Sequence, residues 1–516
     1  MGEIARSVQN AFERTEVVLG RSWPVWALAL LFYAFAAYIL LTRVRLPSPA
    51  HLVVYTMAAA ILVITLMKVE WALLGLVLMI PFARPGFTIG ELKIFHVSAF
   101  NMAMIGVWLV FIVRHFADRE LAAKGPLFRR TPLDVAAAVF LLLLILTSLI
   151  NLNYNLRATV QARTLLYMKE YILYFAWFYL VVTLLRTPSD LRRFALFFAG
   201  SAILVATFGL WSRVTGASQS AQVMSEAERV GGVAGGRTGG VGEGGWFGLG
   251  HPNLFAAFLI MAMPFWYYAT AHLRKLSHRM IGNMAIVFGF VALLYTYSRA
   301  AWGGITIGLG VLGLRDPSAL RRTLIFVVAF VIVAQVMTVS LIGMGVVEVI
   351  QMRFEQLGRS NFSARPEIYA AAMDLLRERP FRGVGLFAFS EHASVTFTSR
   401  VAHAHNVFLT MATEAGIPGA LAFTVFIGWI FFYAVRSLRV SKIPGYGFLA
   451  QSSFVGLFAI LTLMQFDHIF FDRNVGHAFF ALLAIIVAQN RMIQERLLPG
   501  MEHEITQAPG PLWIES

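Results

Sequence analysis

Residues 133–151 of the chain, LDVAAAVFLLLLILTSLIN, form an apolar run close to the ~20 residues that a membrane-spanning helix needs. Hydrophobic residues make up 58% of the 516-residue chain and the mean hydropathy is +0.71, which is more apolar material than a soluble domain of ordinary size could bury. The sequence therefore predicts an all-α, polytopic membrane protein of about 14 transmembrane helices. The other apolar runs lie at 24–43, 50–67, 70–84, 97–115, 168–185, 193–212, 252–272, 281–298, 300–314, 322–344, 417–435, 447–468 and 475–490.

Lys and Arg clusters between the runs indicate the orientation, because cytoplasmic loops carry an excess of positive charge. If the N-terminus is inside, only Arg43 and Arg45 clearly violate this bias. We therefore expect both termini in the cytoplasm. The clusters that then face the cytoplasm are Arg114, Arg119, Lys124, Arg129 and Arg130; Arg186, Arg192 and Arg193; Arg274, Lys275 and Arg279; Arg315, Arg321 and Arg322; and Arg436, Arg439 and Lys442.

Composition also excludes several classes of function. The net charge is +15, but excess Lys and Arg beside membrane spans indicates orientation and contact with anionic membrane lipids, so we expect no nucleic-acid partner. The chain has no cysteine, which excludes disulfides, thiolate metal sites and cysteine nucleophiles.

Two long loops face the outer side in this topology. The first, residues 213–251, is rich in glycine, and the second, residues 345–416, is mostly polar. In the second loop, Arg365-Pro366-Glu367 predicts the start of a short helix that ends at Pro380, with an apolar stripe suited to the outer leaflet. We expect six regions: N-terminal transmembrane helices at 1–212, the glycine-rich loop at 213–251, central helices at 252–344, a large catalytic loop at 345–416, C-terminal helices at 417–490 and a cytoplasmic tail at 491–516.

The second loop ends in residues that can carry proton chemistry. His403, His405 and Asn406 lie just before the next apolar run, and histidine accepts protons near neutral pH because its ordinary pKa is ~6.5. We interpret them as functional, although interfacial polar residues would give the same pattern. A metal site is the rival interpretation, but no further His, Asp or Glu clusters with them in the sequence to complete it.

Three outer arginines are candidates for binding a diphosphate. A guanidinium group can donate two hydrogen bonds to two phosphate oxygens at once, and it keeps its charge at any working pH. Arg237 lies in the glycine-rich loop, Arg299 at the boundary between two apolar runs, and Arg365 at the start of the loop helix. An arginine at a span boundary is costly without a partner, whereas Arg237 could simply be solvated. Glu170 and Asp467 lie close to spans and could be buried partners for an arginine or merely interfacial, and Asn253 is a lesser polar candidate.

These residues resemble the O-antigen ligase and O-antigen polymerase superfamily over roughly residues 230–425. The resemblance is carried by the order of the motifs and their placement between apolar runs. They are Gly-Gly-Arg237 with His251-Pro252-Asn253; Tyr297-Ser298-Arg299-Ala300; Arg365-Pro366-Glu367-Ile368-Tyr369; Pro380-Phe381-Arg382-Gly383-Val384-Gly385; His403-Ala404-His405-Asn406; and Glu414-Ala415-Gly416-Ile417-Pro418-Gly419.

The resemblance implies a C-type, metal-independent, inverting glycosyltransferase that needs no cofactor. Its donor would be a glycan on undecaprenyl diphosphate at the outer face of the bacterial inner membrane, and its acceptor a glycan, lipid or protein. Carried over to this chain, it makes His405 the general base with His403 beside it. Arg237, Arg299 and Arg365, with Asn406, would bind the diphosphate, and Arg299 would also act in catalysis. The predicted spans outnumber the usual twelve of the ligases by about two, which leaves the acceptor undecided.

Polymerase and ligase remain equal possibilities at this point. A transporter or lipid-linked oligosaccharide flippase is the alternative from another class, but transporters generally have interrupted spans and ionisable residues near the membrane midplane. Here the spans are continuous and the candidate residues gather on the outer side. A non-catalytic assembly subunit is a further alternative.

Overall fold

In a computed structural model of the chain, the regular elements among the described residues are helices and one small antiparallel hairpin, β1 (Gly86–Thr88) paired with β2 (His96–Ser98). Its many apolar helices confirm the prediction of a helical, polytopic membrane protein. The structure describes residues 49–83, 86–88, 96–117, 126–154, 158–214, 252–271, 275–296, 298–315, 364–393, 403–440 and 446–495, with single residues at 321, 332, 335, 339, 345, 347, 348, 351 and 443.

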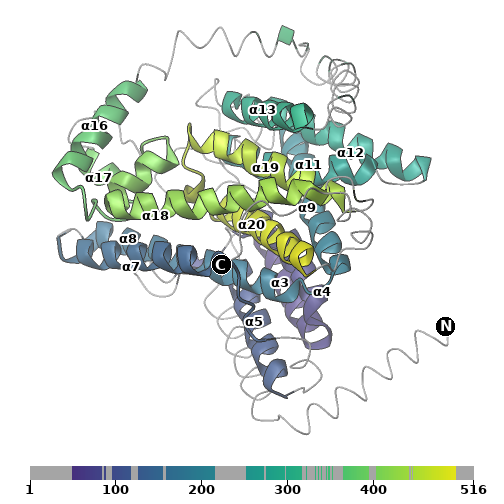
Figure 1. The fold of residues 1–516 in the computed structure, drawn as a ribbon, viewed down its shortest axis with the longest axis horizontal. Helices are drawn as coiled ribbons and strands as arrows, with labels where there is room; N and C mark the ends of the chain where they lie inside the picture. Colours follow the sequence, from purple (N-terminus) through teal and green to yellow (C-terminus); the bar gives the residue numbers. More distant parts are fainter. Residues whose placement is uncertain are drawn as a thin grey trace, which may run out of the picture.

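The long helices coincide with most of the predicted apolar runs, while the runs at 24–43 and 322–344 lie outside the described residues save for single positions in the second. Most of them run alongside one another in Figure 1, with α3, α4 and α5 below the rest. These helices are α3 (Pro49–Met67), α4 (Val69–Met79), α5 (Ala99–Ala117), α7 (Asp134–Tyr154), α8 (Ala158–Leu184), α9 (Pro188–Val214), α11 (Pro252–Ala271), α12 (Leu276–Tyr295), α13 (Arg299–Arg315), α18 (Val407–Ser437), α19 (Gly447–Met464) and α20 (Arg473–Gln494). The shorter elements are η1 (Ile80–Phe82), α16 (Ala364–Glu378), α17 (Phe389–Ala393), η4 (Leu438–Val440) and η5 (Ile469–Phe471).

Six of the described helices are long and apolar enough to cross a membrane: α5, α7, α8, α18, α19 and α20. These helices differ in how deeply they are buried. In the most apolar stretch of α20, 89% of the residues are buried, and in that of α7 33% are. α20 is therefore central, and α7 turns leucine, isoleucine and valine side chains outward, as a lipid-facing helix does. The total of about fourteen spans stays a prediction.

Small residues allow the helices around α19 to approach closely. A side chain at Gly304 of α13 would collide with the backbone of Ala459, and one at Gly456 would press on the backbone of Met261 in α11. Membrane helices commonly pack through such glycines, because hydrocarbon chains give no hydrophobic drive for association. The α11–α19 contact also carries a hydrogen bond from the Ser452 hydroxyl to the Pro264 carbonyl, at 2.9 Å.

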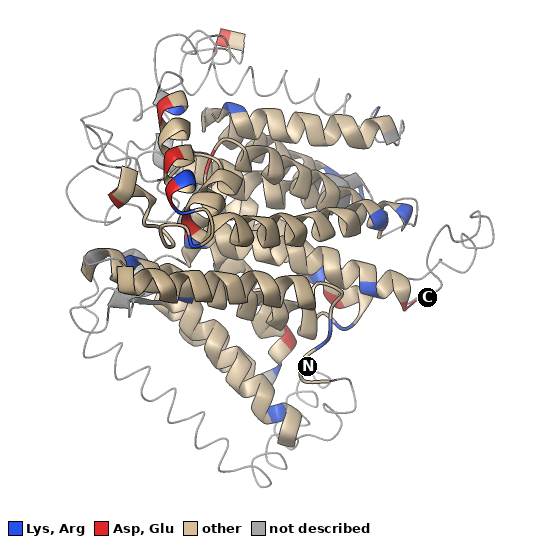
Figure 2. Ribbon diagram, turned by 60° about the vertical axis from the view of Figure 1, so that its left-hand side comes forward, with Lys and Arg blue, Asp and Glu red and all other residues tan. Residues whose placement is uncertain are grey.

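The helices alternate in direction, so the bundle has two ends. The site end holds residues 403–406 and 465–472, and the opposite end holds the C-termini of α3, α8 and α20. Most Lys and Arg ribbon segments in Figure 2 lie near helix ends, and long uncharged stretches lie between them. Because successive helices alternate in direction, several described groups of basic residues belong to the opposite end. They lie at 114, 129–130, 186–193 and 436–439.

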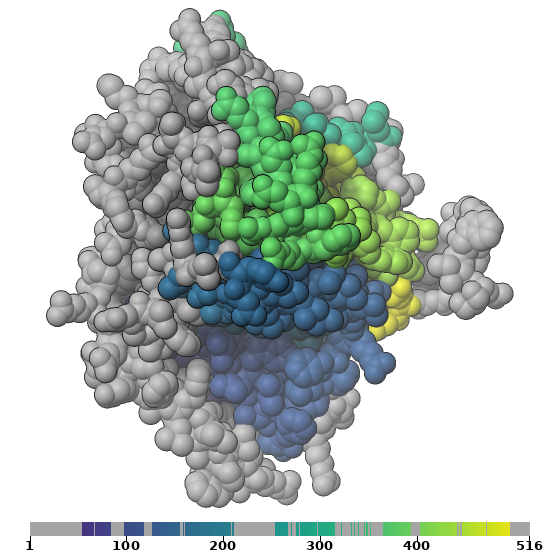
Figure 3. Space-filling view, turned by 90° about the vertical axis from the view of Figure 1, so that its left-hand side faces the viewer, coloured from purple at the N-terminus to yellow at the C-terminus, as the bar shows by residue number. Residues whose placement is uncertain are grey.

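The short helices α16 and α17 lie on the site end above α7 and α8, as the green and blue surfaces of Figure 3 show. The apolar stripe predicted for the loop helix faces protein and not the outer leaflet. Ile368, Ala372 and Leu375 of α16 form a second core with Val384, Phe389 and Ala404. The stripe was correctly identified, but neighbouring loop residues cover it, because residues 380–393 fold back beneath the helix.

Candidate active site

Two turns that are far apart in the sequence meet at the site end. The first is His403–Asn406, immediately before α18, and the second is the turn between α19 and η5 that contains Asp467. Asn406 caps α18, since its side-chain oxygen accepts the Leu409 amide at 3.0 Å. His405 has a φ of 50°, in the left-handed region that non-glycine residues seldom adopt. Such backbone strain often occurs at functional sites.

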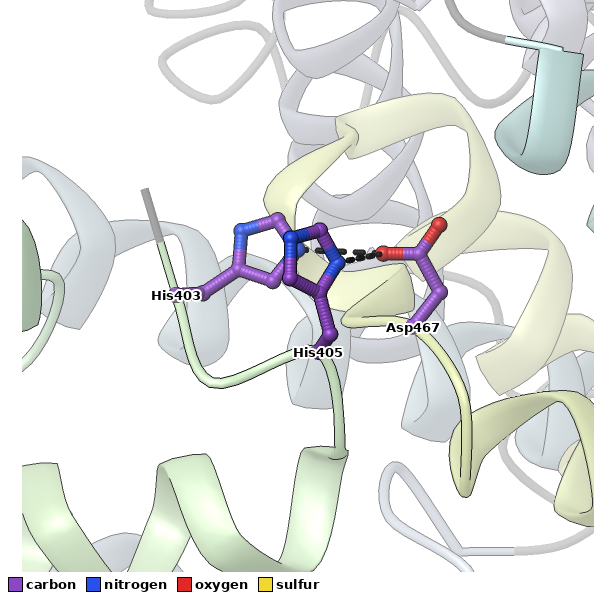
Figure 4. Close-up of side chains that lie close together, drawn as sticks. All are labelled: His403, His405 and Asp467. Carbon is purple, nitrogen blue, oxygen red and sulfur yellow. Dashed lines mark hydrogen bonds and ion pairs between the residues drawn. The ribbon is translucent and has the colours of Figure 1, made fainter. Parts of the chain in front are cut away.

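The two imidazoles point at one carboxylate oxygen (Figure 4). His403 Nε2 lies 3.0 Å from Asp467 Oδ1, and His405 Nδ1 lies 3.6 Å from the same oxygen. His403 and Asp467 are nearly buried, with 12% and 7% of their side chains exposed, whereas His405 is 37% exposed. His405 is thus the member of this triad (His403, His405 and Asp467) that a substrate can reach.

Asp467 is held by further donors. The Asn253 amide, at the start of α11, donates to Asp467 Oδ2 at 2.7 Å, and the backbone N–H of His468 donates to Oδ1 at 2.8 Å. Hydrogen bonds to both oxygens favour the ionised carboxylate and fix its plane. Asp467 can therefore orient both imidazoles.

The environment keeps the inner histidines neutral. Burial lowers the pKa of His403, and the hydrogen bond and charge of Asp467 only partly oppose this. Burial also lowers the pKa of His468 to well below its ordinary value, and its ring nitrogens have no hydrogen-bond partner among the described residues. The His468 ring stacks on Phe387, with ring centroids 5.3 Å apart. His403 can then serve as a neutral hydrogen-bond donor to Asp467.

Two more predicted residues reach the Asp467 turn. Arg365, from the start of α16, donates from Nη2 to the Phe466 carbonyl at 3.3 Å, and its guanidinium lies 5.8 Å from the centroid of the Phe466 ring. The Asn406 amide donates to the Gln465 carbonyl at 3.3 Å. Residues from α16, the 403–406 loop and α11 therefore converge on residues 465–468.

Arg299 begins α13 at the same end of the bundle. Gly304 and Gly308 of α13 contact α19 at Ala459 and Val455, so the two helices are antiparallel and the start of α13 lies level with the end of α19. This register brings Arg299 near the turn that carries Asp467. Arg237 lies outside the described residues.

Sequence reasoning missed the role of Asp467. It was considered as a buried partner for an arginine or as merely interfacial, and the structure joins it to His403, His405 and Asn253. The argument against a metal site is also wrong in its premise, because Asp467 completes a group whose ligand atoms lie within 4.8 Å of one another. The only sequence signal was an acidic residue at a span end, 60 or so residues from the histidines, and sequence distance hides such a contact.

Glu170 does have the predicted arginine partner. Arg473 Nε lies 3.0 Å and Lys169 Nζ 3.2 Å from Glu170 Oε1, and Glu170 is fully buried. The two cations offset the cost of burying this carboxylate inside the bundle.

The Glu414–Gly419 motif has a backbone role. Gly416 has a φ of 73°, which kinks α18 and lets the 380–385 turn dock against it. Val384 N–H donates to the Thr413 carbonyl at 2.9 Å, and Ile417 N–H donates to the Pro380 carbonyl at 2.7 Å. Any side chain at Gly383 or Gly416 would collide with the opposing backbone. Two motifs from the sequence thus bind each other and position the loop that carries the histidines.

Comparison with known proteins adds to this geometry. Residues 284–424 match the family model described as O-antigen ligase. No protein among curated sequences matches the chain. The matched segment runs from α12 into α18 and contains Arg299, Arg365 and both triad histidines, whereas Asn253 and Asp467 lie outside it. The predicted resemblance to the O-antigen ligase superfamily is confirmed over this segment.

Proposed function

We propose that the protein transfers a glycan from a lipid diphosphate carrier to an acceptor hydroxyl, because residues 284–424 match the O-antigen ligase family model. The carrier suggested by the resemblance is undecaprenyl diphosphate, and the acceptor is a glycan, a lipid or a protein. The observation that carries the proposal is the convergence of His403, His405 and Arg365 on the Asp467 turn. A chain that only assembled or transported glycans would not need an exposed imidazole bound to a buried carboxylate.

In the proposed reaction His405 is the general base. Asp467 faces His405 Nδ1, which favours the tautomer with the proton on Nδ1 and leaves the Nε2 lone pair available. The acceptor O–H gives its proton to Nε2 while the oxygen attacks the anomeric carbon. The bond from that carbon to the diphosphate oxygen breaks, and the diphosphate leaves with the electron pair. A single displacement inverts the configuration of the anomeric carbon. A general base of this kind typically raises the reaction rate by ~10²–10⁴-fold.

Arg365 and Arg299 supply the positive charge in this proposal. The leaving diphosphate gains negative charge as the bond breaks, so cations already in place stabilise the transition state more than the ground state. Arg365 is held at the Asp467 turn through the Phe466 carbonyl, within the same local structure as the base. Arg237 and Asn406 complete the proposed diphosphate-binding set, and no step of the proposal requires a metal.

We place the reaction at the outer face of a bacterial inner membrane, with both termini in the cytoplasm. The basic residues at the opposite end of the bundle support this orientation, since positive charge is retained on the cytoplasmic side. Polymerisation and ligation share the same chemistry and differ only in the acceptor.

The test uses purified protein in lipid vesicles with a glycan on a lipid diphosphate and a hydroxyl acceptor, with released lipid diphosphate and lengthened acceptor measured together. We expect both products from the natural chain, and a loss of ~10²–10⁴-fold in His405→Ala. Near-normal transfer by a correctly inserted His405→Ala protein would remove the base assignment. Transport of the donor across the vesicle membrane without any new glycosidic bond would favour a flippase.

A further inference from the structure

The triad at the site end has the geometry of an open metal site. It brings together one ring nitrogen of His403, one ring nitrogen of His405 and one oxygen of Asp467, all within 4.8 Å of one another. His403 Nε2 lies 3.0 Å and His405 Nδ1 lies 3.6 Å from Asp467 Oδ1. Ligands of tetrahedral Zn²⁺ with bonds near 2.0 Å are separated by about 3.3 Å, which falls between these values. Two histidines and one carboxylate form a frequent three-ligand Zn²⁺ site whose fourth position stays open.

We propose that His403, His405 and Asp467 bind a late first-row divalent cation such as Zn²⁺, and that the bound ion inhibits glycan transfer. The inhibitory half rests on the proposed function, because it requires His405 to be the base. The binding half depends on the geometry alone.

The surroundings of the triad suit an ion of this class. Asn253 and the backbone N–H of His468 already hold the Asp467 carboxylate, and outer partners of this kind orient metal ligands. Imidazole ligands select Zn²⁺, Co²⁺ or Ni²⁺ over Mg²⁺ and Ca²⁺, which prefer sites made of oxygen alone. His405 is 37% exposed, so an ion has a route to the site and the His405 ring has room to adjust.

Inhibition follows from the single proton on a neutral imidazole. An ion at His405 Nδ1 uses the lone pair of that nitrogen, so the ring proton must sit on Nε2. In that tautomer Nε2 is a donor and cannot accept the proton of the acceptor hydroxyl. The ion at Nδ1 thus disables the base at the other nitrogen without occupying it. Its charge also draws the Asp467 carboxylate away from its role in orienting the histidines.

Binding is tested with Co²⁺, whose visible absorption reports its coordination. Untagged protein in detergent is titrated with Co²⁺ and then with Zn²⁺, and Mg²⁺ serves as the negative control. We expect an absorption band at one equivalent that Zn²⁺ abolishes and Mg²⁺ leaves unchanged. His403→Asn, His405→Asn and Asp467→Asn should each lose the band, whereas His115→Gln, at the opposite end of the bundle, should keep it. Absence of a band, or a band that survives all three triad variants, overturns the proposal. Size-exclusion profiles identify any variant that fails to fold, and its result is then replaced by that of the next triad member.

Inhibition is tested by the transfer assay at Zn²⁺ concentrations that saturate the site. We expect transfer to fall by about 10²–10⁴-fold and to recover when a chelator is added, because the loss equals removal of the base. The inhibitory role would be overturned if Zn²⁺ increased transfer, or if transfer stayed low after the chelator had removed the ion. A Co²⁺ band in a protein whose His405→Ala variant still transfers glycan would contradict the proposed function and leave the binding site intact.

Discussion

The two ends of the helix bundle use charged side chains in opposite ways. At the end that holds the C-termini of α3, α8 and α20, arginines donate to backbone carbonyls of helix C-termini. Arg491 donates to the carbonyls of Val182 and Leu185, and Arg114 donates to that of Leu66. At the site end, the Asp467 carboxylate faces side-chain donors from two separate segments: the Asn253 amide at the start of α11, and the His403 and His405 imidazoles of the 403–406 loop.

This difference suggests that the arginine contacts at one end stabilise the fold and that the carboxylate at the site end serves the reaction. The donors of Arg491 and Arg114 are taken up by helix-end carbonyls, so these two arginines complement the negative end of the helix dipole and fix the helices to one another. A carboxylate that faces an exposed imidazole can move a proton.

Asp467→Asn should cause the largest loss. An amide keeps the size of the side chain but removes the charge that favours the His405 tautomer with a free Nε2, so we expect transfer to fall between about 10²- and 10⁴-fold. The matched control is Asp374→Asn, which removes a carboxylate that pairs with Arg377 on the exposed face of α16. If both variants lose transfer equally, the carboxylate at the site end has no special role.

Arg491→Gln should affect stability and not chemistry. Hydrogen bonds from a charged donor contribute about 1.5–3 kcal/mol, so we expect the free energy of unfolding to fall by about that amount. Denaturant unfolding in detergent measures this change. Transfer per folded molecule should stay at the natural level, and a selective loss of transfer would break the division between the two ends.

Arg365→Gln should weaken donor binding. Loss of one charge-assisted contact to the diphosphate should raise the half-saturating donor concentration by about 10-fold. Arg377→Gln, on the same helix and paired with Asp374, provides the matched control. If the half-saturating donor concentration is the same in the two variants, Arg365 does not bind the diphosphate.

His468→Phe should have the smallest effect, on the pH dependence of stability. The pKa of His468 lies well below its ordinary value in the fold, so the unfolded chain takes up a proton below about pH 6.5 and the folded chain does not. Stability therefore falls with falling pH, by about 1 kcal/mol for each unit of pH. In the variant, the drop in unfolding temperature between about pH 7.5 and pH 5.5 should shrink. An unchanged drop would mean that His468, beside His403, His405 and Asp467, does not titrate on unfolding.

The sequence predicted the long helices well, because an apolar run of ~20 residues has few alternatives to a buried or membrane helix. The sequence also singled out the histidines as candidates, since polar residues at a span end need a reason. Asp467 and Asn253 could not be assigned, because their roles depend on α11 and α19 lying beside the 403–406 loop. The Glu414–Gly419 motif was recognised but its backbone role was not, because the φ of Gly416 becomes meaningful only against the 380–385 turn.

In the proposed reaction Asp467 acts on the acceptor through the His405 ring. A double-mutant cycle tests this coupling, with transfer measured for His405→Ala, Asp467→Asn and the double variant. Residues that act as one unit lose activity in a strongly non-additive way. We predict that the double variant is no slower than His405→Ala alone. If the two losses multiply instead, the carboxylate and the imidazole act independently and the account is wrong.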